Sequence, residues 1–149
     1  MRRIRLVPPI CFLLAIVLQV ALDRLLPGPE MLDASWRWLG LLLPVPALLL
    51  AATAAWALVR RRTTLNPFGT PSRLVTDGPF RYTRNPVYLA LACLLLGVAT
   101  GLGSLAAFLV VPAFARAITA GFIRREEQAL SAAFGPAYAE YCRRVGRWL

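Results

Sequence analysis

"GPFRYTRNPVYLALACLLLG", residues 78–97, is the stretch in which a polar part of the chain becomes strongly apolar. Its first half carries arginines and aromatic residues, and almost every residue after Pro86 is apolar. Asparagine followed by proline is typical of a helix start, because asparagine can cap free amide groups and proline is tolerated in the first turn. The stretch therefore predicts a helix that begins at Pro86 and enters an apolar environment.

The composition of the whole chain is typical of a membrane protein. Of its 149 residues, 58% are hydrophobic, and the mean hydropathy is +0.61. The net charge of +10 comes from 17 arginines and seven acids, with no lysine and no histidine. The arginines stand at the ends of apolar runs, where arginine contacts lipid phosphate groups, and no nucleic-acid-reading motif accompanies them. The composition therefore indicates a bilayer as the partner, not a nucleic acid.

Four apolar segments are long enough, or nearly long enough, to cross the hydrocarbon core of a bilayer, which takes about 20 helical residues. They cover residues 6–22, 38–59, 86–100 and 104–123. Pro44 and Pro46 are expected to kink the second segment. The third and fourth are separated only by a short glycine turn and must form a tight hairpin. The predicted fold is all-α and polytopic, with about four transmembrane helices.

The distribution of arginines predicts the topology of a single membrane domain over residues 1–149. Arginine clusters before the first segment, after the second and at the C-terminus all fall on one side, which the positive-inside rule assigns to the cytoplasm. Two N-terminal helices (1–60) would precede a cytoplasmic loop (61–85), a helical hairpin (86–123) and a cytoplasmic helical tail (124–149). Both termini are then cytoplasmic, in an integral membrane protein of the bacterial inner membrane.

The tail is expected to be helical but interrupted. Gly135-Pro136 should break it, and the helix should resume to about Val145. Leu130, Phe134, Tyr138 and Tyr141 or Cys142 recur at helical spacing, so they form an apolar stripe suited to the membrane surface or to the preceding loop.

Two groups of residues have both a structural and a functional interpretation. Asn85-Pro86 can simply start a helix, or the free amides there can receive a carboxylate or phosphate beside Arg84. Glu126-Glu127 can simply be a neutralised helix end, or a paired site for a cationic ligand. A ligand that carries both a positive centre and a carboxylate would suit the two groups together.

The segment from about residue 72 to 147 resembles the isoprenylcysteine carboxyl methyltransferase family and, more distantly, the membrane phospholipid N-methyltransferases. The resemblance lies in the order of "LVTDGPFRYTRNPVYL", a two-helix hairpin, "EEQAL" and "FGPAYAEYCRRVGR". It implies a membrane-embedded methyltransferase that binds S-adenosylmethionine between cytoplasmic segments. Carried over by position, the cofactor-binding residues are Ser72, Arg73, Leu74, Val75, Phe80, Asn85, Pro86, Val87, Tyr88 and Glu126.

The resemblance also suggests catalytic and substrate-binding residues. Glu127 and Arg84 are the candidate catalytic residues, with Glu127 supporting or orienting the reacting groups. Eukaryotic prenylcysteine enzymes hold their substrate with an arginine where this chain has Phe122, so Arg124 and Arg125 are the candidates for substrate binding here. A carboxylate acceptor needs no base, whereas an ammonium does, and the chain has no histidine. We therefore expect a carboxylate on a lipid or prenylated small molecule, with no metal required.

Three other functions are compatible with the same residues. One is N-methylation of a phospholipid amine. A second is an NADPH-dependent membrane reductase with a fold like that of the sterol reductases. The third is a non-catalytic membrane subunit that keeps the motifs only as determinants of its fold.

Overall fold

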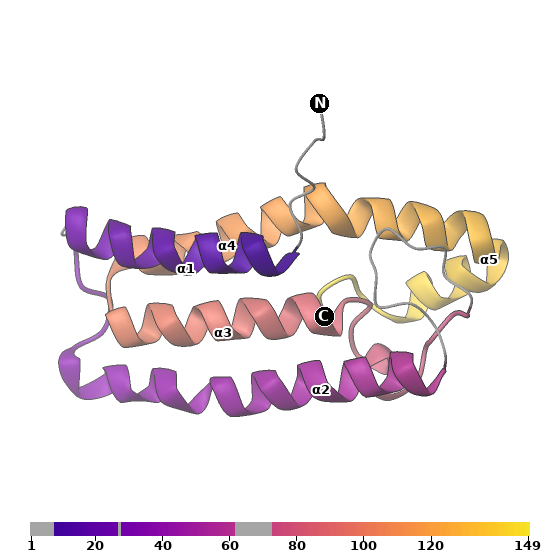
Figure 1. Cartoon of the computed structure of the whole chain (residues 1–149), viewed down its shortest axis with the longest axis horizontal. Helices are drawn as coiled ribbons and strands as arrows, with labels where there is room; N and C mark the ends of the chain where they lie inside the picture. Colours follow the sequence, from indigo (N-terminus) through magenta and orange to yellow (C-terminus); the bar gives the residue numbers. More distant parts are fainter. Residues whose placement is uncertain (1–7, 27, 62–72) are drawn as a thin grey trace. The chain divides into compact units, whose positions relative to one another are not determined.

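The computed structural model describes residues 8–26, 28–61 and 73–149, which are helical with no β-strand among them (Figure 1). Ser72, one of the predicted cofactor ligands, lies outside the described residues. In chain order the elements are α1 (Pro8–Leu25), the 3-10 helix η1 (Ala34–Leu42), α2 (Pro44–Arg60), the 3-10 turn η2 (Gly78–Arg81), α3 (Pro86–Leu102), α4 (Leu105–Ile118), the π-helical turn η3 (Thr119–Ile123) and α5 (Arg124–Arg144).

Three helical runs in the described part of the chain are long and apolar enough to cross a membrane. They are Pro8–Leu25, Ala34–Arg60 and Leu105–Arg144, and the 17-residue helix α3 is a shorter apolar one. In the third run the apolar part is α4 with η3, whereas α5 begins with four consecutive charged residues and is polar on average. The predicted all-α fold, with helices apolar enough to cross a membrane, is thus confirmed, while the number of crossings and the orientation remain predictions.

The chain divides into two compact units, each made of segments distant in sequence. The first, called here the apolar unit, contains residues up to Val45 together with Leu91–Ile118. The second, called the charged unit, contains Pro46–Ala90 and Thr119–Leu149. Every predicted site residue that the structure describes belongs to the charged unit.

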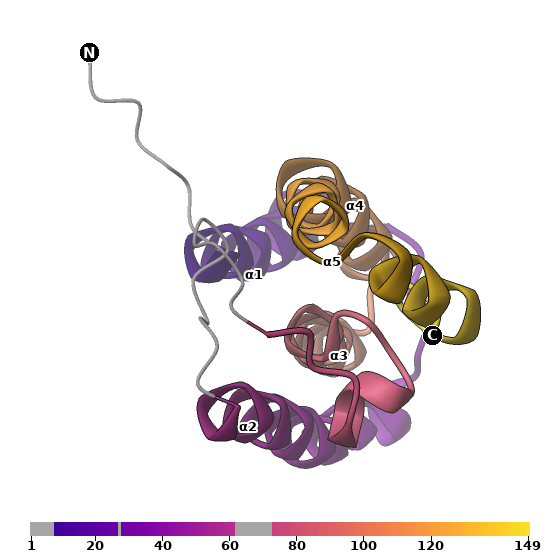
Figure 2. The same cartoon turned by 90° about the vertical axis from the view of Figure 1, so that its right-hand side faces the viewer.

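The apolar unit is held together by helix packing and close backbone approach. In both Figure 1 and Figure 2, α1 lies along α4, and the Phe12 and Phe114 rings meet edge to face with centroids 6.5 Å apart. The fully buried Gln19 amide donates hydrogen bonds to the Leu95 and Ala107 carbonyls at 3.0 and 3.1 Å, so one polar side chain links α1 to α3 and α4.

The predicted tight turn between the third and fourth apolar segments is also present in the apolar unit. Gly103 joins α3 to α4 with φ of +79°, a backbone conformation that favours glycine. Its carbonyl accepts a hydrogen bond from the Met31 backbone N–H at 2.7 Å, and the Leu105 N–H donates to the Pro29 carbonyl at 3.1 Å. These bonds fasten the segment before η1 to the hairpin turn.

The charged unit is shaped by a reversal within α5. Gly135 has φ of +48° and ψ of −120°, and Pro136 follows it, so α5 folds back as two arms, residues 124–134 and 136–144 (Figure 1). The predicted break is confirmed. The predicted apolar stripe packs against Leu74 of the loop before α3. Tyr138, Tyr141 and Val145 are buried there, and Leu130, Phe134 and Cys142 are partly buried.

Two details of the helices differ from the sequence prediction. Pro44 and Pro46 do not kink a continuous apolar helix, since η1 ends at Leu42 and Pro44 is the first residue of α2. Proline is tolerated there because the first amides of a helix have no carbonyl partner within it. The fourth apolar segment changes to π geometry at η3 before α5 begins, which the sequence did not indicate.

Candidate functional site

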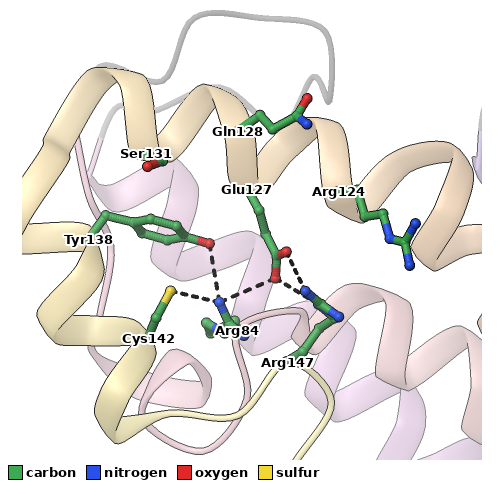
Figure 3. A pocket seen from close by; sticks show the side chains of 8 residues that line it. All are labelled: Arg84, Arg124, Glu127, Gln128, Ser131, Tyr138, Cys142 and Arg147. Atoms are coloured by element: carbon green, nitrogen blue, oxygen red, sulfur yellow. Dashed lines mark hydrogen bonds and ion pairs between the residues drawn. The ribbon is translucent and has the colours of Figure 1, made fainter.

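Three charged side chains from separate segments of the charged unit meet in one ion-pair cluster (Figure 3). Arg147 donates from Nε and Nη2 to the two carboxylate oxygens of Glu127, at 2.8 and 2.7 Å. Arg84 Nη1 lies 3.2 Å from Oε1 of the same carboxylate. The Arg84 and Glu127 side chains are only 14% and 16% exposed, so solvent screens this pair weakly. The two predicted catalytic residues are therefore in direct contact.

The same cluster borders an open pocket of about 400 Å³. One residue of the loop before α3, both arms of α5 and the segment after it form its walls, as Figure 3 shows for the side chains. The lining residues are Arg84, Arg124, Glu127, Gln128, Ser131, Tyr138, Cys142 and Arg147. Small-molecule sites in proteins are typically about 300–1,000 Å³, so a ligand of nucleoside size is compatible with this volume.

Arg84 is held at the pocket by groups on the second arm of α5. Its Nη1 donates to the Cys142 sulfur at 2.7 Å and to the Tyr138 hydroxyl at 3.5 Å. Burial raises the pKa of Tyr138, and it raises that of Tyr141 to about 12, so both phenols stay protonated at neutral pH. The tyrosines can therefore donate hydrogen bonds there but are poor bases.

Glu126 faces a different partner from its neighbour Glu127. The Tyr88 hydroxyl donates to Glu126 Oε1 at 2.6 Å, which ties the first turn of α5 to the first turn of α3. Burial raises the pKa of the Glu126 carboxyl, the bond from Tyr88 opposes this, and the nearby Glu127 charge adds to it. Tyr88 and Glu126, both predicted to contact the cofactor, are thus in contact with each other.

The segment after α5 fixes the start of α3. The Arg147 carbonyl accepts hydrogen bonds from the Asn85 side-chain amide at 2.9 Å and from the Thr83 hydroxyl at 3.4 Å. The Arg84 backbone N–H donates to the Gly146 carbonyl at 3.0 Å. Asn85 and Pro86 are buried, and α3 begins at Pro86 as predicted. Arg147 therefore orders this region through both its side chain and its backbone.

The remaining predicted cofactor residues lie in the loop before α3 or at its start. Val75 is buried and Leu74 packs on the cluster that includes Tyr138. Phe80 accepts a hydrogen bond from the Tyr141 hydroxyl on its carbonyl at 2.7 Å. Val87 is partly buried, whereas Arg73 is exposed. These residues do not line the pocket, and their role in cofactor binding remains a prediction.

The two predicted substrate-binding arginines have different surroundings. Both Arg124 and Arg125 are exposed, but only Arg124 lines the pocket. Sequence reasoning did not select five of the lining residues: Gln128, Ser131, Tyr138, Cys142 and Arg147. In the sequence, Tyr138 and Cys142 belong to an apolar stripe and Arg147 to the arginines of the tail, and neither pattern indicates a pocket. A loop-to-tail contact across 62 residues, such as that of Asn85 with Arg147, leaves no local pattern in a sequence.

A comparison with protein families identifies the relationship. The sequence model of the phospholipid methyltransferase family matches residues 35–137, which include Arg84, Glu126 and Glu127. The chain belongs to this family. It is a family of membrane methyltransferases. The match supports the resemblance to the phospholipid N-methyltransferases, and it does not confirm membership of the isoprenylcysteine group. No curated protein and no solved structure matches the chain.

Proposed function

We propose that this protein is an S-adenosylmethionine-dependent methyltransferase that modifies the head group of a membrane lipid. The observation that carries the proposal is the family match, which extends over residues 35–137. The apolar helical runs would give access to a lipid acceptor from the bilayer. Their presence supports an integral membrane protein, which we place in the bacterial inner membrane, and the distribution of arginines favours both termini in the cytoplasm.

The residues present are chemically suited to the cofactor. S-adenosylmethionine carries a carboxylate, an ammonium, ribose hydroxyls and an adenine ring. The charged unit offers guanidinium groups at the pocket, and the Glu126 carboxyl is adjacent in sequence to the lining residue Glu127. Arg84 Nε is a buried donor with no partner among the described residues. We assign Tyr88, Glu126 and the start of α3 to cofactor binding, together with the loop that contains Leu74 and Val75.

When bound, S-adenosylmethionine would supply an electrophilic methyl group on a sulfonium sulfur. Transfer is an in-line displacement in which the acceptor lone pair forms the new bond to carbon while the carbon–sulfur bond breaks. The task of the protein is to align the reacting groups and to exclude water. We assign Glu127 and Arg84 to this alignment, because their mutual ion pair and Arg147 hold both side chains in place.

The first candidate acceptor is the amine of a phospholipid, as the family description suggests. A protonated amine must lose its proton before it can attack, so this reaction requires a base. For this acceptor Glu126 would take the proton instead of holding the cofactor, because its raised pKa brings it nearer to neutral pH than an ordinary glutamate.

The second candidate acceptor is a carboxylate of the isoprenylcysteine type. The observation in its favour is the pairing of Glu127, whose two oxygens accept hydrogen bonds from Arg147. Because Arg147 occupies both oxygens, the Glu127 carboxylate is a weak base. A substrate carboxylate is already ionised, so its methylation requires no base.

A labelling experiment tests the proposal and separates the two acceptors. The purified protein in lipid nanodiscs is incubated with methyl-labelled S-adenosylmethionine and either phosphatidylethanolamine or a farnesylcysteine derivative. We expect label that stays non-volatile after alkali treatment, because N-methyl groups resist alkali whereas methyl esters release volatile methanol. Label released as volatile methanol would select the carboxylate. No label with either acceptor, or with a total bacterial lipid extract, would contradict the proposal.

A further inference from the structure

The pocket in the charged unit carries an excess of positive charge. Its lining includes the guanidinium groups of Arg84, Arg124 and Arg147 but only one carboxylate, that of Glu127. Both oxygens of this carboxylate already accept hydrogen bonds from Arg147, and one of them also faces Arg84. A ligand in the pocket therefore meets surplus positive charge and no uncompensated negative charge.

Arg124 is the lining arginine best placed to act on a ligand. It stands one turn before Glu127 on the first arm of α5, and Figure 3 shows its guanidinium on the same side of Glu127 as Arg147. Among the described residues, Glu127 is paired with Arg84 and Arg147, and no ion pair involves Arg124. Its side chain is exposed, so an incoming anion could reach it without breaking a contact within the protein.

Arg84 adds positive charge to the same pocket from the loop before α3. Its Nη1 is used by Glu127, Tyr138 and Cys142, and its Nε is a buried donor with no acceptor among the described residues. Buried donors are normally satisfied by a protein group, a water or a ligand. Guanidinium groups suit planar carboxylates and phosphates, to which they can donate two parallel hydrogen bonds.

We infer that this pocket binds an oxyanion of the ligand, with Arg124 as its principal contact. The inference rests on the proposed function and makes it more specific. Two sources are compatible with it, the phosphate of an acceptor phospholipid and the carboxylate of the cofactor. Either source places an anionic group beside Arg124 and leaves Glu127 to hold Arg84 and Arg147 in place.

Calorimetric titration of the full chain in an uncharged detergent tests the inference. The probes are S-adenosylhomocysteine, 5′-methylthioadenosine, which lacks the carboxylate, and dihexanoylphosphatidylethanolamine, which carries the phosphate. The variant is Arg124→Gln. The matched control is Arg125→Gln, because Arg125 is the next residue on the same arm and is exposed but does not line the pocket.

Loss of one charge-assisted contact should weaken binding by about ten- to a hundredfold. Weaker binding of S-adenosylhomocysteine, but not of methylthioadenosine, in Arg124→Gln supports the carboxylate. Weaker binding of the short-chain lipid supports the phosphate. Equal affinities for every probe in the Arg124→Gln and Arg125→Gln proteins would overturn the inference, and so would a wild-type protein that binds none of them.

Activity distinguishes this outcome from failure of the proposed function. Methyl transfer that continues equally in both variants would leave the methyltransferase in place and remove the oxyanion site. If lipid binding depended on Arg124 but the protein transferred no methyl group, the oxyanion site would be supported and the proposed methyltransferase function would be contradicted.

Discussion

The two units of this protein use different physical means to hold distant segments together. In the apolar unit, the Gly40 and Gly97 backbones approach so closely that a Cβ on Gly40 would lie 2.4 Å from the Gly97 carbonyl oxygen. In the charged unit, the corresponding contacts are ion pairs and hydrogen bonds between side chains, centred on Glu127. Close backbone packing thus adds to the Gln19 hydrogen bonds in the apolar unit, whereas ion pairs add to the apolar cluster around Tyr138 in the charged unit.

This difference distinguishes the unit that holds α1, α4 and most of α3 from the unit that holds the candidate site. Packing of small residues is the usual way for helices to associate in lipid, where burial of apolar surface gives little gain. Paired charges fix geometry more strongly when they are shielded from water. The side chain of Glu127, in the first turn of α5, is only 16% exposed. Substitutions should therefore affect the two units through different mechanisms.

The largest effect is expected at the close contact in the apolar unit. In Gly40→Ala the new methyl group would meet backbone atoms of α3, namely the Gly97 oxygen at 2.4 Å and the Gly101 nitrogen at 2.9 Å. Backbone cannot move aside as a side chain can, so the free energy of unfolding should fall by about 3 kcal/mol. Thermal unfolding in detergent measures this, with Gly101→Ala as the control, since a Cβ there meets nothing within 4 Å. Equal melting temperatures would refute the close contact.

The next effect concerns the ion-pair cluster of the charged unit. Glu127→Gln leaves Arg84 and Arg147 without their shared carboxylate, and we expect a loss of about 2 kcal/mol, below the range for fully buried pairs. Glu140→Gln is the matched control on the same helix, because Glu140 pairs with Arg143 and Arg144 at an exposed surface, where such pairs contribute about 0.5 kcal/mol. Denaturant unfolding of both variants makes the comparison, and similar losses would show that burial does not strengthen the Glu127 cluster.

A smaller effect should appear in the pH dependence of cofactor binding. The pKa of Glu126 is raised by burial, so its ionised form is lost as the pH falls through a value above the ordinary 4.5. If the ionised carboxylate holds the cofactor, S-adenosylhomocysteine affinity should fall about five- to tenfold across that window. Because protonation of a buried acid favours the folded state, stability should change in the opposite direction. Titrations at a series of pH values test this, and Glu126→Gln should bind weakly at every pH.

The smallest effect is expected at the buried polar residue of the apolar unit. Gln19→Leu removes two hydrogen bonds donated to helix carbonyls, but it also removes Oε1, a buried acceptor with no partner among the described residues. The two changes oppose each other, so the net loss should stay within about 1 kcal/mol. If Gln19→Leu lowered the melting temperature as much as Gly40→Ala, the Gln19 hydrogen bonds would stabilise this unit as strongly as the close backbone packing does.

Features encoded in a few neighbouring residues were predictable from the sequence. Asn85-Pro86 fixes the start of α3, and Gly135-Pro136 fixes the reversal of α5, because proline and glycine restrict or permit backbone conformations locally. The contacts of Arg147 were not predictable, since they depend on how the chain folds after two helices and a reversal. The pairing of Glu126 with Tyr88 likewise joins residues 38 positions apart. The resemblance of motifs supplied both residues, but only the fold brings them together.

Binding of S-adenosylhomocysteine to the purified protein is the measurement that tests the methyltransferase assignment most directly. The titration would compare the wild-type chain, Glu126→Gln and the control Glu140→Gln in the same detergent. We predict saturable binding at one site per chain, weakened about five- to tenfold in Glu126→Gln and unchanged in Glu140→Gln. Absence of binding by a wild-type protein shown to be folded would contradict the proposed function.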